Sequence, residues 1–116
     1  ICPYQHTLGT LVVVSKTHKE LFPELSQEEI IELRKIVIDA YVLLGKQFFP
    51  DWFNLQQNGN WEHHLHFQII PRYKDSRTFE GREFLDRHFA QPVEYTKQQE
   101  DFVFLERMTA LLKTSL

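Results

Sequence analysis

Two histidines and a glutamine alternate with apolar residues in the stretch His64-Leu65-His66-Phe67-Gln68. Successive side chains of a β-strand point to opposite faces, so His64, His66 and Gln68 would share one face. Along the strand they would lie about 6.5–7 Å apart. Leu65 and Phe67 would share the other face, which we predict to be buried. The spacing therefore predicts a row of two imidazoles and an amide on one side of a sheet.

Such a row can do phosphoryl chemistry. Imidazole is a competent nucleophile near neutral pH because its ordinary pKa of about 6.5 lies close by. One histidine could attack a phosphorus atom, and the labile phosphoramidate could then pass its group to a second acceptor. The other members of the row could stabilise the developing charge. A solvated strand face is the alternative interpretation.

A metal site is a second alternative. His64 and His66 give two ligands, whereas zinc sites use three or four, so His18 or Cys2 would have to approach from elsewhere. His63 has the opposite strand phase from His64, and we predict a structural place for it. The residue types alone leave phosphate chemistry and metal binding open.

Strands and a long helix must position this row. A β-branched run predicts a strand over 10–15, and Ser26 with Glu29 forms a capping box before apolar residues at helical spacing over 27–48. Asn58-Gly59 is a strong tight-turn signal. On its two sides we predict strands over 52–57 and 61–70, the second ended by Pro71.

The remaining third of the chain is less regular. We predict an irregular stretch over 74–82, an ambiguous stretch with a short strand over 83–95, and a capping box formed by Thr96 and Gln99. A helix would follow with its apolar stripe at Phe102, Leu105, Met108 and Leu112. The order of elements predicts an α+β domain with an antiparallel sheet.

Composition limits the partners and the compartment. The chain has 116 residues, which suits one domain, and a net charge of -3, which argues against nucleic-acid binding. We see no apolar run of the roughly 20 residues that span a bilayer, so no membrane partner is expected. A single cysteine excludes an internal disulfide and favours a reducing, cytoplasmic setting.

The stretch from His64 to Arg72 resembles the signature of the histidine triad (HIT) superfamily, in which three histidines alternate with apolar residues, often before Pro-Arg. Similar stretches occur at LVVVSKTH (11–18), LFPELSQEE (21–29), FNLQQNG (53–59) and RTFEGREFLD (77–86). The resemblance implies a HIT-like fold, an antiparallel sheet with one long central helix and a C-terminal helix. We expect one such domain over 1–116, without the family's N-terminal strands.

The resemblance also implies an activity. A nucleotide hydrolase or nucleotidyl transferase of this family would act on the α-phosphate of a dinucleoside polyphosphate, such as a diadenosine polyphosphate, or of a nucleoside phosphate derivative. His66 matches the nucleophile that forms a nucleotidyl-histidine, His64 the member that positions it, and Gln68 the member that contacts the phosphate and the leaving group. The implied substrate-binding residues are His18, Gln57, Asn54 and Arg72. Asn54 has the opposite strand phase from Gln57, and Arg72 could instead hold a carboxylate.

Gln68 departs from the family pattern, which has a third histidine. An amide donates hydrogen bonds but cannot supply a proton as an imidazolium does, so leaving groups that need little protonation would suit the site. The same His-x-His-x-Gln pattern is found in dinucleoside polyphosphate phosphorylases and hexose-1-phosphate nucleotidyltransferases, which are alternatives to a hydrolase. An inactive nucleotide-binding or zinc-binding module is a third reading. The resemblance implies no required cofactor, leaves a divalent metal open, and implies a homodimer.

Overall fold

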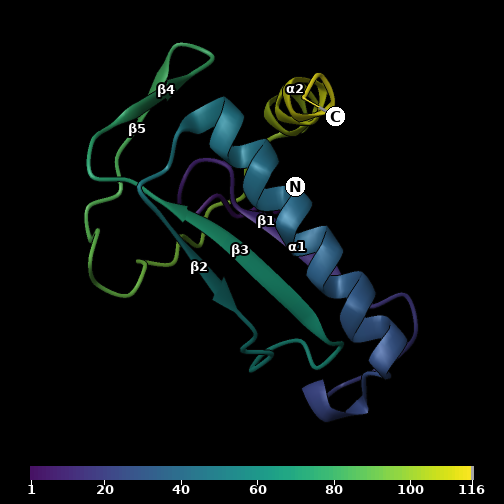
Figure 1. The fold of residues 1–116 in the computed structure, drawn as a ribbon. Helices are drawn as coiled ribbons and strands as arrows, with labels where there is room; N and C mark the ends of the chain where they lie inside the picture. The colour runs from purple at the N-terminus through teal and green to yellow at the C-terminus, as the bar shows by residue number, and fades with distance from the viewer. Residues whose placement is uncertain (116) are drawn as a thin grey trace.

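The computed structural model describes residues 1–115 and contains an antiparallel sheet with a long helix across one face (Figure 1). In chain order its elements are β1 (Leu11–Val14), the 3-10 turn η1 (Phe22–Glu24), α1 (Gln27–Phe48), β2 (Trp52–Gln56), β3 (His66–Arg72), β4 (Arg77–Phe79), β5 (Arg82–Phe84) and α2 (Phe102–Lys113). The predicted α+β class with an antiparallel sheet, a long helix and a C-terminal helix is confirmed.

The sheet has the strand order β1-β3-β2, with β3 between two antiparallel neighbours. The register pairs His66 with Val14 of β1, and Gln68 with both Val12 of β1 and Gln56 of β2. Strands β4 and β5 form a separate hairpin beside the end of β3 (Figure 1). Within residues 1–115, no helix is both long enough and apolar enough to cross a membrane.

The capping box fixes the start of α1, as the sequence predicts. The backbone N–H of Glu29 donates to Ser26 Oγ at 3.1 Å, and the N–H of Ser26 donates to Glu29 Oε1 at 2.9 Å. At the other end Phe49 turns the chain with a φ of 50°. Arg77 then donates to the carbonyl oxygens of Phe48 and Phe49 at 2.8 and 2.7 Å, which satisfies two groups that a helix end leaves open.

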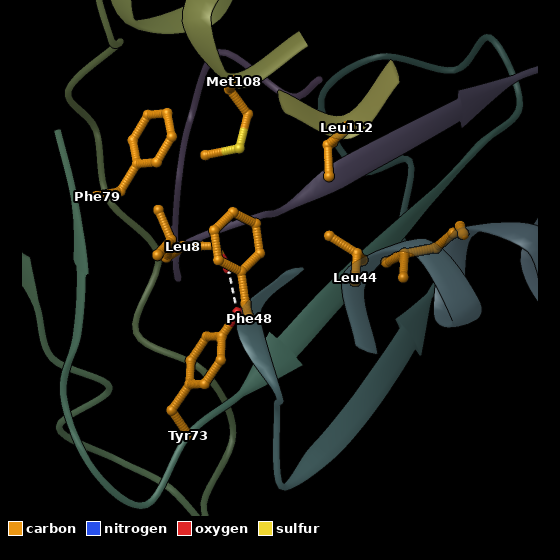
Figure 2. Packing of buried hydrophobic residues seen from close by; sticks show 9 residues of the cluster. Leu8, Leu44, Phe48, Tyr73, Phe79, Met108 and Leu112 are labelled. Atoms are coloured by element: carbon orange, nitrogen blue, oxygen red, sulfur yellow. Dashed lines mark hydrogen bonds between the residues drawn. The ribbon is translucent and has the colours of Figure 1, made fainter. Parts of the chain in front are cut away.

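The core lies between α1, α2 and the helix-facing side of the sheet. Figure 2 shows Phe48 of α1 surrounded by side chains from the N-terminal loop, the β4–β5 hairpin and α2. The Tyr73 hydroxyl donates to the carbonyl oxygen of Leu8 at 2.6 Å, so the end of β3 is tied to the loop before β1. The buried cluster comprises Leu8, Ala40, Leu44, Phe48, Ile69, Tyr73, Phe79, Met108 and Leu112.

The strand predicted over 61–70 is wrong at both ends, because β3 runs from His66 to Arg72. Asn58-Gly59 does not close a tight hairpin, and residues 57–65 form an irregular connection. Pro71 is tolerated within β3 because no strand needs an N–H from it. In an antiparallel strand the N–H and C=O of one residue point to the same side, and the Pro71 carbonyl oxygen accepts from Thr7 Oγ1 on the side where β1 has already ended.

Two further predictions need correction in the last third of the chain. The stretch 74–82, predicted to be irregular, holds β4 and the turn into β5, with Glu80 and Gly81 both at positive φ (51° and 73°). That backbone is the one a two-residue hairpin requires. The N-cap of α2 is Asp101, whose side chain accepts from the Phe104 N–H at 2.9 Å, whereas Thr96 only bonds the N–H of Gln98 nearby.

Gly9 sets the approach of the N-terminal loop to α1, and we expect Gly9→Ala to destabilise the fold. Gly9 has a φ of +89°, and an added Cβ would lie 3.0 Å from Leu44 and 3.1 Å from Phe48. The expected loss is about 1–3 kcal/mol of unfolding free energy, measured by urea denaturation.

Gly45→Ala in α1 is the matched control. An added Cβ there meets nothing within 4 Å, so the helix should gain about 0.5–1 kcal/mol. Equal effects of the two substitutions would contradict the packing described for Gly9.

Candidate active site

The predicted row lies on the face of the sheet opposite α1. His66 and Gln68 belong to β3, and His64 precedes the strand by two residues. All three side chains are half-buried, whereas the alternate residues Leu65, Phe67 and Ile69 are buried at 1%, 9% and 0% exposure. Ile69 belongs to the apolar cluster under α1. One face of β3 thus anchors the strand, and the other presents the polar row.

The imidazole of His66 is oriented by the main chain. Its Nδ1 lies 2.8 Å from the carbonyl oxygen of His64. A carbonyl oxygen can only accept, so Nδ1 carries the hydrogen and donates it. In the neutral ring the lone pair is then on Nε2, which makes Nε2 the atom able to attack an electrophile.

His64 is held in the opposite sense. Its Nε2 lies 2.7 Å from the carbonyl oxygen of Ser15, so Nε2 carries the hydrogen. Two backbone bonds run alongside this contact: the N–H of Leu65 donates to Lys19 O at 2.7 Å, and the N–H of Ser15 donates to Leu65 O at 3.2 Å. The segment after β1 therefore fixes both the ring of His64 and the main chain of the adjacent Leu65.

His18 joins the row, as the family resemblance implies. Its ring packs edge-to-face against His64, with 5.4 Å between ring centroids and an interplanar angle of 74°. The side chain is exposed, and Nε2 lies 3.5 Å from Glu20 Oε1. Within residues 1–115, no three His, Cys, Asp or Glu side chains gather as a metal-holding group.

The amide beside Gln68 is Gln56. These two residues are direct cross-strand partners, so their side chains lie on the same face. Gln57, which the family resemblance favours, comes after the last residue of β2, and its Nε2 packs near Gly59. The sequence held a signal for Gln56, because it alternates with Asn54 at the spacing of the histidine row. The register needed to place it is non-local.

A further residue at the site, which the sequence does not indicate, is Tyr95. It lies in the irregular segment between β5 and α2, and its hydroxyl donates to Gln56 Oε1 and accepts from Asn58 Nδ2 at 3.1 Å. No local pattern around Tyr95 signals this contact, since it joins positions far apart in the chain.

Arg72 and Asn54 are not brought to the histidines, although the sequence assigns them to substrate binding. Arg72 is 3% exposed and forms a two-bond ion pair with Asp86, at 2.7 and 3.1 Å. It also donates to Asn54 Oδ1 and Gln91 O at 2.7 Å each, and to His88 O at 2.6 Å. These contacts use all of its N–H groups, so none is left for a phosphate.

The Arg72 cluster instead fastens the segment after β5 to the sheet. Burial by itself raises the pKa of Asp86. The hydrogen bonds from Arg72 and from the Tyr73 N–H outweigh it, and the pKa lies below its ordinary value. Asp86 is therefore ionised in the folded protein and pairs with the Arg72 guanidinium. The segment that this pair holds continues to Tyr95.

The hydrogen bonds predict a different tautomer for each of the half-buried histidines His64 and His66. Near pH 8.5, about two units above the ordinary imidazole pKa of about 6.5, long-range proton–nitrogen NMR spectra should show His66 protonated at Nδ1 and His64 at Nε2. His6 serves as an internal control: its Nδ1 accepts from the Thr96 N–H, so it should be protonated at Nε2. An Nε2-protonated His66 would contradict the orientation described here.

No family model matches this chain. An uncharacterized HIT-like protein of Methanocaldococcus jannaschii is 37% identical over 71 residues, a match that covers 57% of this chain and 54% of that protein. The chain thus matches about half the length of this curated relative.

Solved structures share the fold. A histidine triad nucleotide-binding protein of Sulfolobus tokodaii, described as hypothetical, superposes with a TM-score of 0.75 at 21% identity, over 99% of this chain and 74% of that one. A HIT-like protein of Bartonella henselae, described as involved in cell-cycle regulation and solved with an unknown ligand, gives 0.74 at 18% identity, over 100% and 77%. The chain therefore has the fold of these histidine triad proteins, and it shares sequence with the archaeal HIT-like protein over 57% of its residues.

Proposed function

We propose that this chain binds nucleotides and transfers a nucleotidyl group from the α-phosphate of a dinucleoside polyphosphate, or of a related nucleoside phosphate derivative, through a covalent intermediate on His66. The observation that carries the proposal is the bond from His66 Nδ1 to His64 O. It directs the Nε2 lone pair away from the main chain, on a face that also carries Gln68 and Gln56. Nucleotide binding is also how the Sulfolobus structure is described.

The reaction would proceed in two displacements. In the first, the Nε2 lone pair of His66 forms a bond to the α-phosphorus while the bond to the leaving oxygen breaks. The ring then carries a positive charge, and the His64 carbonyl dipole that holds Nδ1–H stabilises it. In the second, an oxygen of the acceptor attacks the phosphorus, the electron pair of the N–P bond returns to Nε2, and the acceptor proton passes to solvent.

Gln68 determines which leaving groups suit the site. Its amide can donate a hydrogen bond to a non-bridging or leaving oxygen, but it cannot protonate an alkoxide. A leaving nucleoside polyphosphate is a stable anion and needs no such proton. We propose water as the acceptor, because the stretch over 77–86 resembles one found in small hydrolases of the histidine triad family. Inorganic phosphate is the second candidate, because Gln68 stands where phosphate-using relatives of the family carry glutamine.

Product analysis with diadenosine tetraphosphate tests the proposal. AMP plus ATP without added phosphate is the expected result, whereas ADP plus ATP formed only with phosphate would identify the second candidate. His66→Ala should reduce the rate by at least about a thousandfold, since it removes the nucleophile. His63→Ala is the matched control, because His63 is exposed and outside the row, and it should retain activity. Turnover that survives His66→Ala would contradict the mechanism.

We also propose that the chain forms a homodimer through α1 and the edge of β2. One stripe of α1 exposes Ile31, Ile38 and Val42 by 53%, 43% and 51%, and Leu55 of β2 is 48% exposed. Among residues 1–115, β2 has β3 on one side and no strand on the other. An apolar stripe beside an open strand edge favours association with a second copy.

Val42→Glu should weaken this association. A carboxylate within the stripe would have to lose its water in the dimer, so sedimentation should shift toward the monomer at concentrations where the unmodified chain is dimeric. Thr78→Glu adds the same charge on β4, away from the stripe, and should leave the dimer intact. A monomeric unmodified chain, or equal behaviour of both variants, would contradict the proposed interface.

A further inference from the structure

Tyr95 links the C-terminal part of the chain to the edge of the site. Its hydroxyl donates to Gln56 Oε1, at the end of β2, and accepts from Asn58 Nδ2 at 3.1 Å. Gln56 in turn faces Gln68, which lies two residues from His66 on the same face of β3. A phenol from a distant segment thus bonds directly to the amide beside the histidine row.

This bond fixes the polarity of the Gln56 amide. Because Oε1 accepts from the phenol, the NH₂ end of the side chain must point away from Tyr95. Without such a partner, the amide could rotate and offer either its oxygen or its nitrogen to the site. An oxygen presented to a phosphate would repel it, whereas N–H groups would bind it.

The ring of Tyr95 is itself held in place. It packs edge-to-face on His6 at 4.7 Å between centroids, and His6 Nδ1 accepts from the N–H of Thr96 at 3.1 Å. Burial lowers the pKa of His6, so the neutral ring that can accept this bond is favoured. The same segment is also held before Tyr95, because Arg72 of β3 donates to the carbonyl oxygens of His88 and Gln91. The hydroxyl therefore meets Gln56 from a fixed position.

We propose that Tyr95 is a positioning residue that orients Gln56 as a second amide donor, beside Gln68, toward the phosphate attacked by His66. The proposal rests on the nucleotidyl-transfer function proposed above and assigns the phosphate-binding role on β2 to Gln56. Gln56 would contact the substrate directly, whereas Tyr95 would act through Gln56. The strand neighbours of β3 would thereby replace part of what a third histidine supplies.

Tyr95→Phe removes the hydroxyl and keeps the ring on His6. We expect kcat with diadenosine tetraphosphate to fall about 3- to 10-fold, the effect of one neutral hydrogen bond, while KM and the melting temperature change little. Gln56→Ala should lower kcat about 10- to 100-fold, because a donor to a charged oxygen is lost. Combining the two should add little to Gln56→Ala alone, since both act through one amide.

Gln56→Glu separates positioning from structural support. A carboxylate at this position still accepts from the Tyr95 hydroxyl, but it has no N–H groups and repels phosphate. Activity should therefore fall at least as far as in Gln56→Ala, while stability is kept. Thr78→Glu, which adds the same charge on β4, is the control and should retain activity. Unchanged activity of Gln56→Glu would overturn the proposal.

A titration with AMP, followed by NMR, gives a readout that does not depend on turnover. The side-chain NH₂ signals of Gln56, assigned by their loss in Gln56→Ala, should shift with AMP, and Tyr95→Phe should reduce that shift. If the backbone amides of His66 and Gln68 respond and the Gln56 NH₂ does not, this inference is wrong and the proposed function stands. If no signal on this face responds and no substrate turns over, both are wrong.

Discussion

The hydrogen bond from His66 Nδ1 to the carbonyl oxygen of His64 is the contact on which the chemistry of the site depends. It selects one tautomer and one orientation of a ring that otherwise has two equivalent choices. The bond is possible because β2 ends at Gln56, two residues before the position opposite His66. Among the described residues, no neighbouring strand takes the His64 carbonyl, so the side chain two residues later can use it. An irregular stretch where a regular hairpin would be expected thus supplies the acceptor.

The fold stabilises the strand that carries this polar row by burying the other face of the same strand. Leu65, Phe67 and Ile69 are almost fully enclosed, and the capped α1 helix lies over them. Because the side-chain period of a strand is two, a slip of one residue would move the imidazoles into the core and the apolar residues into solvent. The hydrophobic face therefore fixes the register, and the register places Gln68 opposite Gln56. The Arg72–Asp86 pair then holds the following segment across the histidine-bearing face.

The parts of the structure that follow from local patterns were predictable from the sequence. The capping box of Ser26 and Glu29 and the helical spacing after it predict α1 with its observed bounds, and the alternation around His66 predicts the site face. Features set by distant contacts were not predictable in this way. Pro71 stays in a strand because the Thr7 hydroxyl donates to its carbonyl oxygen, in place of a neighbouring strand. Arg72 is buried because the carboxylate of Asp86, fourteen residues later, pairs with it.

The same division applies within the site. His64, His66 and Gln68 lie in one short stretch, so their spacing alone predicts a shared face. The alternation of Asn54 with Gln56 is visible in the sequence, but only the strand register places Gln56 opposite Gln68. Tyr95 depends on the path of a segment with no regular structure, so no local spacing indicates it. Asn54 shows the converse: its strand phase matches Gln56, yet its amide oxygen is taken by Arg72. Phase alone does not decide which polar residue on a face remains free to bind a ligand.

The most direct test of the central claim is to trap the covalent intermediate. Protein mixed with diadenosine tetraphosphate would be quenched in alkali, which preserves phosphoramidates, and the modified peptide mapped by mass spectrometry. The expected result is one adenylyl group on His66 that is absent from His66→Ala. An adduct on His64 or His18, or turnover without any adduct, would contradict the assignment of Nε2 of His66 as the nucleophile.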